Sequence, residues 1–314
     1  MLGRSANGVF WMFRYLERAE NCARLLDTGF RMALTSDSIT AEQEWSSVLE
    51  TAGMTESYLE KNGTFTGLQV WNYILREKDN PNSIRSLIGQ VRTNARAVRN
   101  VITAELWLAV NESYLQINEL LSRPVTQANL GDAIAAVKRE ATLVRGAMDG
   151  SMLRNDIYNF GRIGSFVERA DNTARILDVK YYVLLPSLSY VGSSLDNVQW
   201  ETILRSLGAE RAYRWLNAGQ MDAKGIADFL ILDGRFPRSL AFCHAKIRSN
   251  LASLALQYGE ELYAHELIRK FDMRLHDTDI DSIFEQGLHE FLSDFIADNS
   301  EIAHAVETDY RFAD

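Results

Sequence analysis

The chain has few of the residues that interrupt helices, form disulfides or bind metals. Its 314 residues include only four prolines, and because proline breaks helix interiors this favours long helices over loop-rich or sandwich folds. The two cysteines, Cys22 and Cys243, are too few for a disulfide framework and fit small buried side chains in a reducing cytoplasm. All five histidines lie after residue 243, which excludes a histidine site repeated in both halves of the chain.

The sequence also lacks the patterns typical of membrane and nucleic-acid-binding proteins. No apolar run approaches the roughly 18–20 residues that span a bilayer. Lysine and arginine number 33 against 42 acidic residues, a formal net charge of −9, which argues against binding to nucleic acid or to an anionic membrane surface. The opening residues 1–18 lack the basic, apolar and small-residue order of a signal peptide. We therefore expect a cytoplasmic protein that binds neither nucleic acid nor membrane.

Common catalytic signatures are missing as well. The chain contains no GxGxxG, GxxxxGK[ST], GxSxG, HExxH or CxxC pattern, which excludes the enzyme classes that carry those motifs. A carboxylate-bridged dimetal bundle needs a Glu-x-x-His pair on each of two helices, and only Glu301 and His304 have that spacing. We expect no metal site and no cofactor.

What the sequence does contain is an internal repeat. Residues 14–27 read RYLERAENCARLLD and residues 165–178 read SFVERADNTARILD, an offset of 151 residues. Further matches at slightly larger offsets pair Trp45, Leu49, Gly53, Pro81, Ser83, Arg92, Asn94 and Glu105 with Trp200, Leu204, Gly208, Pro237, Ser239, Arg248, Asn250 and Glu261. A period near 150 residues is the size of a domain. The sequence therefore predicts an all-α, tandem-duplicated helical bundle, with copies 1–155 and 156–314 related by a pseudo-twofold axis.

Apolar residues at three- and four-residue spacing predict long helices in both copies. The longest expected helices cover residues 5–34, 81–122, 127–150, 157–185, 237–273 and 283–309. Within two of these helices, Asn94 and Glu105 share one face, and Asn250 and Glu261 share the corresponding face, because eleven residues make three helical turns. Glu105 and Glu261 are therefore candidate partner-binding residues.

The repeated block places matching polar residues on one stripe of the first helix of each copy. The candidate site residues are Glu17, Arg18, Asn21 and Arg24 in the first copy and Glu168, Arg169, Asn172 and Arg175 in the second. We favour a buried or interfacial polar network, because two copies that differ elsewhere share these residues. A ligand or partner site is a second interpretation, and a solvated face with intrahelical ion pairs is a third.

A row of arginines follows Pro81 at spacings of seven, four and three residues: Arg85, Arg92, Arg96 and Arg99. Such a row pairs with acidic stripes on neighbouring helices, for example with Glu17 or Glu20. The alternative is a site that binds phosphates or carboxylates through guanidinium forks. The anion-binding candidates are then Arg92, Arg96, Arg99 and, in the second copy, Arg248.

With the ERAENCARLLD and ERADNTARILD blocks and the opening MLGRSANGVFWMFRYLERAEN in view, the chain resembles the bacterial alpha-E domain family over essentially its whole length. The resemblance implies context more than mechanism. Family members are typically encoded beside, or fused to, a circularly permuted ATP-grasp protein, and they often neighbour a transglutaminase-like protease. ATP-grasp proteins join a carboxylate to an amine through an acyl phosphate, so the resemblance implies a system for peptide or amide ligation.

Three functional hypotheses follow. The first is a non-catalytic partner of the ATP-grasp ligase that binds the ligase or its peptide substrate. The second is an enzyme that acts on an amide or peptide, with Glu17 or Glu168 as general base and Arg24 or Arg175 binding a carboxylate. The third is a homo-oligomeric scaffold without a small ligand. The missing catalytic motifs favour the first.

Overall fold

The computed structural model describes residues 3–34, 38–183, 194–217 and 221–312. Within these ranges the backbone forms fifteen helices and no strand, so the fold is all-α, as the sequence predicts. The helices are α1 Gly3–Ala33, α2 Ser38–Thr51, α3 Thr55–Leu59, α4 Gly67–Arg76, α5 Ile84–Ala97, α6 Ala104–Leu120, α7 Leu130–Ser151, α8 Asp156–Val183, α9 Ser194–Leu207, α10 Glu210–Leu216, α11 Ala223–Ile231, α12 Leu240–Tyr258, α13 Tyr263–Asp277, α14 Ile280–Gln286 and α15 Leu288–Asp309. The predicted end of the α8 segment, at residue 185, lies outside the described residues.

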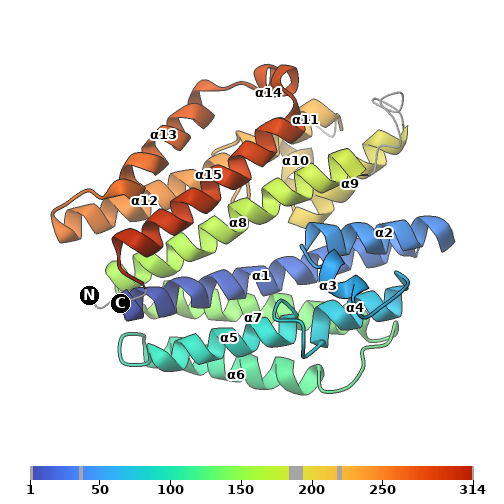
Figure 1. Ribbon diagram of the computed structural model, residues 1–314, viewed down its shortest axis with the longest axis horizontal. Helices are drawn as coiled ribbons and strands as arrows, with labels where there is room; N and C mark the ends of the chain where they lie inside the picture. Colours follow the sequence, from blue (N-terminus) through green and yellow to red (C-terminus); the bar gives the residue numbers. More distant parts are fainter. Residues whose placement is uncertain (1–2, 35–37, 184–193, 218–220, 313–314) are drawn as a thin grey trace. The chain divides into compact units, whose positions relative to one another are not determined.

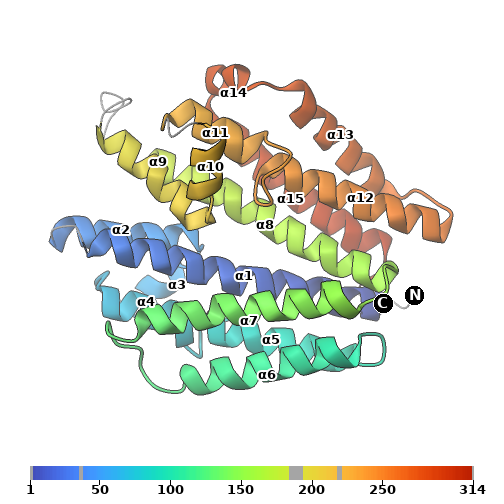
Figure 2. The ribbon, with the colours of Figure 1, turned by 180° about the vertical axis from the view of Figure 1, so that it is seen from behind.

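The chain divides into two compact units. Unit 1 consists of Met1–Ser165 with Phe312–Asp314, and unit 2 of Phe166–Arg311. In unit 1, α1, α5, α6 and α7 form a four-helix bundle in which α1 and α6 each contact both α5 and α7 (Figures 1 and 2). In unit 2, α13 contacts both α12 and α15, and α11 contacts α9, α12 and α14.

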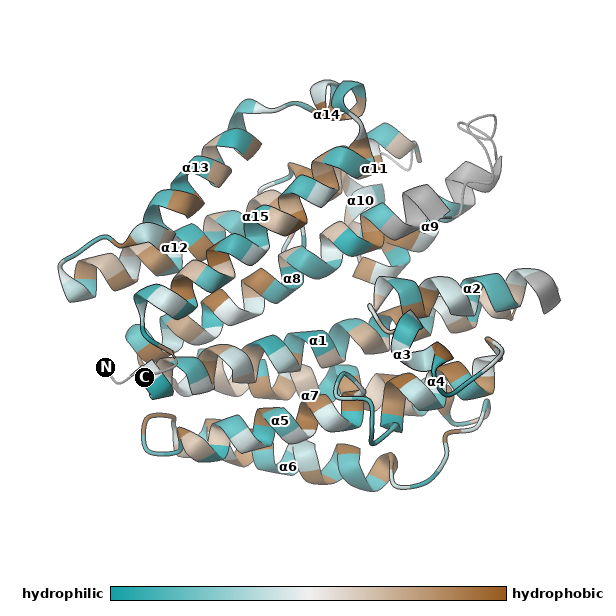
Figure 3. Ribbon diagram, viewed as in Figure 1, coloured by the Kyte–Doolittle hydropathy of each residue, from teal (hydrophilic) through white to brown (hydrophobic). Residues whose placement is uncertain are grey.

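Helix α1 is the centre of the unit 1 core. Its apolar side chains Phe10, Phe13 and Leu16 are fully buried. Hydrophobic and hydrophilic residues are mixed along α1, as they are along α5 and α6 (Figure 3). The start of α8 packs directly on α1, because a Cβ atom added at Gly164 would lie 2.3 Å from the backbone oxygen of Phe10. Glycine is therefore required where these two helices meet.

The two longest predicted helices are each broken into two. The segment 81–122 forms α5 and α6, because Thr103 caps a new helix by accepting a hydrogen bond from the backbone N–H of Leu106 (3.2 Å). The segment 237–273 breaks after α12, where Gly259 adopts a left-handed φ of 75° that ends the helix. The expected helix 283–309 is likewise divided by Gly287 into α14 and α15.

Several turns repeat between the units at the offsets of the sequence repeat. Gly53 and Gly208 end α2 and α9 with φ values of 66° and 67°, and each donates its backbone N–H to the carbonyl three residues earlier. Ser83 and Ser239 cap α5 and α12 in the same way, through their side-chain oxygens. These features support the proposal of an internal duplication, and the pseudo-twofold relation of the copies stays a prediction.

Among the described helices, none combines the length and the hydropathy that a membrane crossing requires.

Candidate functional site

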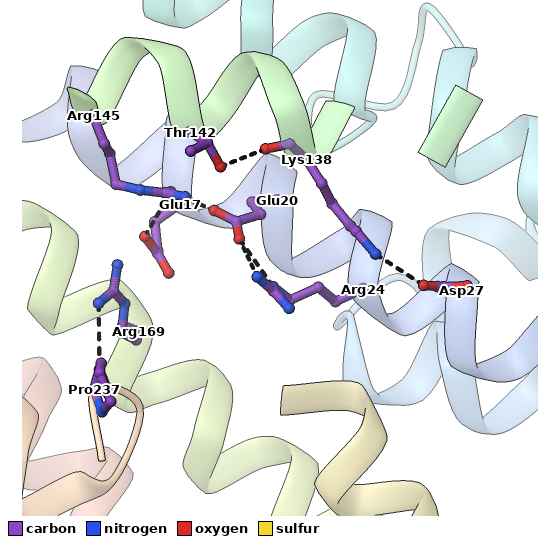
Figure 4. A network of polar contacts seen from close by, with 9 residues as sticks. All are labelled: Glu17, Glu20, Arg24, Asp27, Lys138, Thr142, Arg145, Arg169 and Pro237. Carbon is purple, nitrogen blue, oxygen red and sulfur yellow. Dashed lines mark hydrogen bonds and ion pairs between the residues drawn. The ribbon is translucent and has the colours of Figure 1, made fainter. Parts of the chain in front are cut away.

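Glu17 and Arg24, two of the four first-copy candidates, belong to a largely buried cluster of charges between α1 and α7, which we call the α1–α7 ion network. Its members are Glu17, Glu20, Arg24 and Asp27 on α1 and Lys138 and Arg145 on α7 (Figure 4). Glu17 and Glu20 are each only 1% exposed, and Asn21 and Thr28 on the same helix are also buried. The polar stripe of α1 therefore lies inside the protein, as the buried-network interpretation requires.

Arg145 is the centre of this network. Its Nη1 atom lies 3.4 Å from Glu17 Oε2 and forms a shorter ion pair with Glu20 Oε2. Glu20 Oε1 accepts two hydrogen bonds from Arg24, from Nε at 2.9 Å and from Nη2 at 2.6 Å. Guanidinium groups from two helices thus neutralise the buried carboxylates, which is the condition under which buried charge is tolerated.

The other end of the network joins Asp27 to Lys138. Asp27 Oδ2 accepts a 2.9 Å hydrogen bond from Lys138 Nζ, and its Oδ1 accepts one of 2.9 Å from Arg31. Burial by itself would raise the pKa of Asp27, but the hydrogen bonds from Lys138 and Arg31 and their positive charges outweigh it and lower the pKa below 3.8. Asp27 is therefore held in its charged form.

The spacing of the network follows from antiparallel helix packing. Glu20 and Asp27 are two turns apart on α1, and Arg145 and Lys138 are two turns apart on α7. Acidic and basic side chains therefore meet at both levels, which fixes the register of α1 against α7. The position of Arg145 outside the repeated block explains why the sequence reasoning did not find it.

Unit 2 repeats part of this arrangement. Asp171 and Arg175 form the intrahelical pair at the positions that match Glu20 and Arg24, with hydrogen bonds of 2.7 and 3.2 Å. Glu168 is buried and Asn172 is half-buried. The Asp171–Arg175 pair is much more exposed to solvent than its counterpart in unit 1, so the stripe of α8 is not an equally enclosed network.

The arginines next to Glu17 and Glu168 have matching roles in the two units. Arg18 Nη1 donates to Asn82 Oδ1 (3.2 Å), in the loop that leads into α5. Arg169 Nη1 donates to the backbone oxygen of Pro237 (3.3 Å), in the loop that leads into α12 (Figure 4). Arg18 therefore links α1 to the loop before α5, and Arg169 links α8 to the loop before α12.

The geometry does not offer Glu17 or Glu168 as a general base. A general base must reach a proton on a substrate, and both carboxylates are almost completely buried. In the described residues, no group of three or more His, Cys, Asp or Glu side chains is placed to hold a metal ion.

The arginine row lies elsewhere, and its expected pairing with Glu17 or Glu20 is wrong. Arg85 and Arg92 donate instead to asparagines of α6, because α5 packs between α1 and α6 and the row faces α6. Arg96 and Arg99 are exposed.

The remaining candidates are dispersed. Glu105 is exposed in the first turn of α6 and Asn94 is on α5, so the break at 98–103 removes the face that they were expected to share. Glu261 lies in the loop after α12 and forms an exposed ion pair with Arg269. Arg248 pairs with Asp272 of α13 at 2.9 Å. The structure brings none of these into the α1–α7 ion network.

A buried acidic residue on α7, Glu140, was also missed. Glu140 is buried and accepts a 3.1 Å hydrogen bond from Ser113 of α6, while its other oxygen lies 3.2 Å from Arg139 Nε. The only sequence signal for the basic residues of α7 is the seven-residue spacing of Lys138 and Arg145, which equals that of Glu20 and Asp27.

Fold and site together define an all-helical protein whose repeated Glu-Arg block is part of the packing. The chain belongs to the Alpha-E family, described as a predicted alpha-helical domain with a conserved ER motif, which it matches over residues 1–310. In one-letter code ER is Glu-Arg, and this chain has that pair at 17–18, 168–169 and 210–211.

Mycobacterial proteins are among those similar to the chain. The uncharacterized protein Mb2597 of Mycobacterium bovis is 23% identical over 317 residues, which cover 94% of this chain and 35% of that protein. The uncharacterized protein Rv2567 of Mycobacterium tuberculosis matches with the same identity and coverage. The chain thus spans about a third of the length of these curated relatives (35%). No solved structure matches the chain.

Proposed function

We propose that the protein is a non-catalytic docking component of an ATP-grasp amide ligase system, which binds the ligase or its peptide substrate. The observation that carries the proposal is the state of the Glu-Arg block. Glu17 is buried and ion-paired, and Arg18 and Arg169 bind loops of the protein itself. The Glu-Arg pairs therefore stabilise the fold instead of facing a substrate, which supports a protein that offers its surface to a partner.

The relatives support a role beside other domains. A region similar to this chain forms 35% of the mycobacterial proteins, so a module of this kind occurs within longer chains. The family resemblance supplies the ATP-grasp protein as the expected partner. We place this system in the cytoplasm, where ATP is present, and the free, buried Cys22 and Cys243 are compatible with a reducing compartment.

The test is co-purification with the ATP-grasp protein encoded beside the chain. Both proteins are co-expressed, with a tag on one, and the complex is measured by size-exclusion chromatography with light scattering. We expect a complex of defined stoichiometry and a ligase activity that falls when the helical protein is left out. Separate elution together with unchanged ligase activity contradicts the proposal.

The same light-scattering measurement on the protein alone distinguishes the scaffold hypothesis from the docking role. A homo-oligomer that does not change on addition of the ligase favours a structural scaffold. An enzyme would instead turn over an amide substrate without the ligase, and Glu17→Gln would abolish that turnover.

A further inference from the structure

The arginine row of unit 1 is ordered by contacts with α6 that do not neutralise its charge. Arg85 Nε donates to Asn118 Oδ1 at 2.8 Å, and Arg92 Nε donates to Asn111 Oδ1 at 2.9 Å. The hydrogen bonds use only the Nε edge of each guanidinium. The two terminal nitrogens of each group therefore stay available for an end-on fork with a carboxylate.

Aromatic rings of α6 hold two of the arginines from a second side. The guanidinium carbon of Arg92 lies 4.7 Å from the centre of the Tyr114 ring, and that of Arg99 lies 5.1 Å from the Trp107 ring. Cation–π contacts of this kind orient the group without neutralising its charge. The row is thus pre-organised rather than a set of free side chains.

No carboxylate balances this row within the described part of the chain. The contacts of Arg85, Arg92 and Arg99 are those to asparagine, tyrosine and tryptophan, and Arg96 has no ion pair there. Arg96 is four residues from Arg92 on α5, and like charges at this spacing destabilise a helix. In a chain of net charge −9, an uncompensated basic row indicates an acidic partner.

Two acidic residues of α6 lie next in sequence to the asparagines that bind the row. Glu112 and Glu119 each follow by one residue an asparagine that binds the row, and one residue rotates a helix by about 100°. Among the described residues, neither carboxylate forms an ion pair with an arginine of the row.

An apolar strip lies beside the row. Leu108 and Leu115 on α6 are 54% and 55% exposed. They are three residues before and four residues after Asn111, so all three side chains are neighbours on the helix surface. A partner that binds the arginines therefore also meets two exposed leucines, and apolar contact adds to the electrostatic attraction.

From this combination we infer that the α5–α6 surface binds an acidic amphipathic helix of a partner protein. Arg85 and Arg92 on α5 are seven residues apart, as are Leu108 and Leu115 on α6, and seven residues span about 10.5 Å along a helix. A helix with glutamates at seven-residue intervals matches this spacing. Residues on one face of an extended strand recur at about 6.7 Å, which does not match the spacing of about 10.5 Å.

Nucleic acid fits this surface less well. Proteins that bind single strands stack the bases on aromatic faces, whereas one face of the Tyr114 ring and one face of the Trp107 ring already carry a guanidinium group. The net charge of −9 also repels a dense polyanion.

The inference gives a partner chemistry to the docking role proposed above and rests on that role only for the identity of the partner. The test uses a designed 21-residue peptide helix, labelled with fluorescein, with glutamates at seven-residue intervals along one edge and leucines beside them. Its binding to the full chain is measured by fluorescence anisotropy at low salt. A version with glutamine in place of glutamate and a single-stranded oligonucleotide are measured in parallel.

Two triple variants decide the outcome. Arg92→Gln/Arg96→Gln/Arg99→Gln removes three charges from the row. The control Lys78→Gln/Arg123→Gln/Arg211→Gln removes three charges from exposed positions outside it. We expect the row variant to weaken peptide binding about tenfold, because each exposed pair contributes modestly, and the control variant to change it less than about twofold.

Three results would overturn the inference. They are equal binding of the glutamate and glutamine peptides, equal losses in both triple variants, and oligonucleotide binding as tight as that of the peptide and lost in the row variant. A thermal melt of each variant shows that it is folded. Because no ligase is present in this assay, its outcome is independent of the co-purification experiment.

Discussion

Removal of Arg145 should destabilise unit 1 more than removal of a surface arginine. Arg145 is 19% exposed and is the α7 partner of both Glu17 and Glu20, which are 1% exposed. Breaking a buried ion pair from one side costs about 3–5 kcal/mol, because it leaves buried charge uncompensated. Since Arg24 still pairs with Glu20, we expect Arg145→Ala to cost about 3 kcal/mol, a fall in Tm of roughly 6–12 °C for a unit of this size.

The matched control is Arg31→Ala. Arg31 pairs with Asp27 of the same network, but its side chain is 68% exposed, so its loss should cost less than about 1 kcal/mol. Urea unfolding followed by circular dichroism gives both values, and hydrogen exchange of α1 and α7 locates the effect. In the Arg145→Ala background, Glu20→Gln should recover part of the loss by removing the buried charge. An Arg145→Ala protein as stable as Arg31→Ala would refute the reasoning.

Three further predictions concern packing and pH. Gly164→Ala should lower the free energy of unfolding in urea by about 2–3 kcal/mol, because its Cβ would meet the Phe10 backbone. Gly146 has open space around it, so Gly146→Ala should raise the free energy of unfolding by about 0.5–1 kcal/mol. Equal effects would contradict the close helix contact. The pKa of His244 is lowered from 6.5 to about 3, first by burial, so the folded protein favours the neutral imidazole. The free energy of unfolding should therefore fall between pH 6.5 and pH 3, by up to about 1.4 kcal/mol per pH unit. His244→Leu should flatten this part of the plot of stability against pH. The lowered pKa of Asp27 contributes stability that is present above pH 3.8 and is lost as the pH falls further. Asp27→Asn should therefore make the free energy of unfolding less dependent on pH below 3.8. An unchanged dependence on pH would contradict the assigned ion pairs.

Helical class was predictable because apolar spacing reports it directly, whereas helix ends were harder to place. The break between α5 and α6 contains neither proline nor glycine, and its signal is Thr103, whose side chain caps α6. The break after α12 does have a sequence signal in Gly259, which adopts a positive φ at the end of the helix. Reading each long segment as one helix placed Glu105 and Glu261 on faces that the structure does not contain.

The candidate site was predictable in part. The repeated block identified Glu17, Arg18 and Arg24, because matched polar residues in two divergent segments are constrained by their surroundings. Their partner Arg145 was not predictable, since it depends on which helix packs against α1. Local sequence periodicity fixes the faces of a helix but not its neighbours, and for the same reason the arginine row was assigned to the wrong helix.

Carboxyl labelling of the native protein tests the central claim most directly. A carbodiimide couples an amine to accessible carboxylates, and mass spectrometry reads the extent at each residue. If the repeated block is enclosed packing, Glu17 and Glu20 should stay unmodified under conditions in which the exposed Glu105 and Glu112 react, and they should react after unfolding. Labelling of Glu17 in the folded protein at the rate of Glu112 would contradict the account.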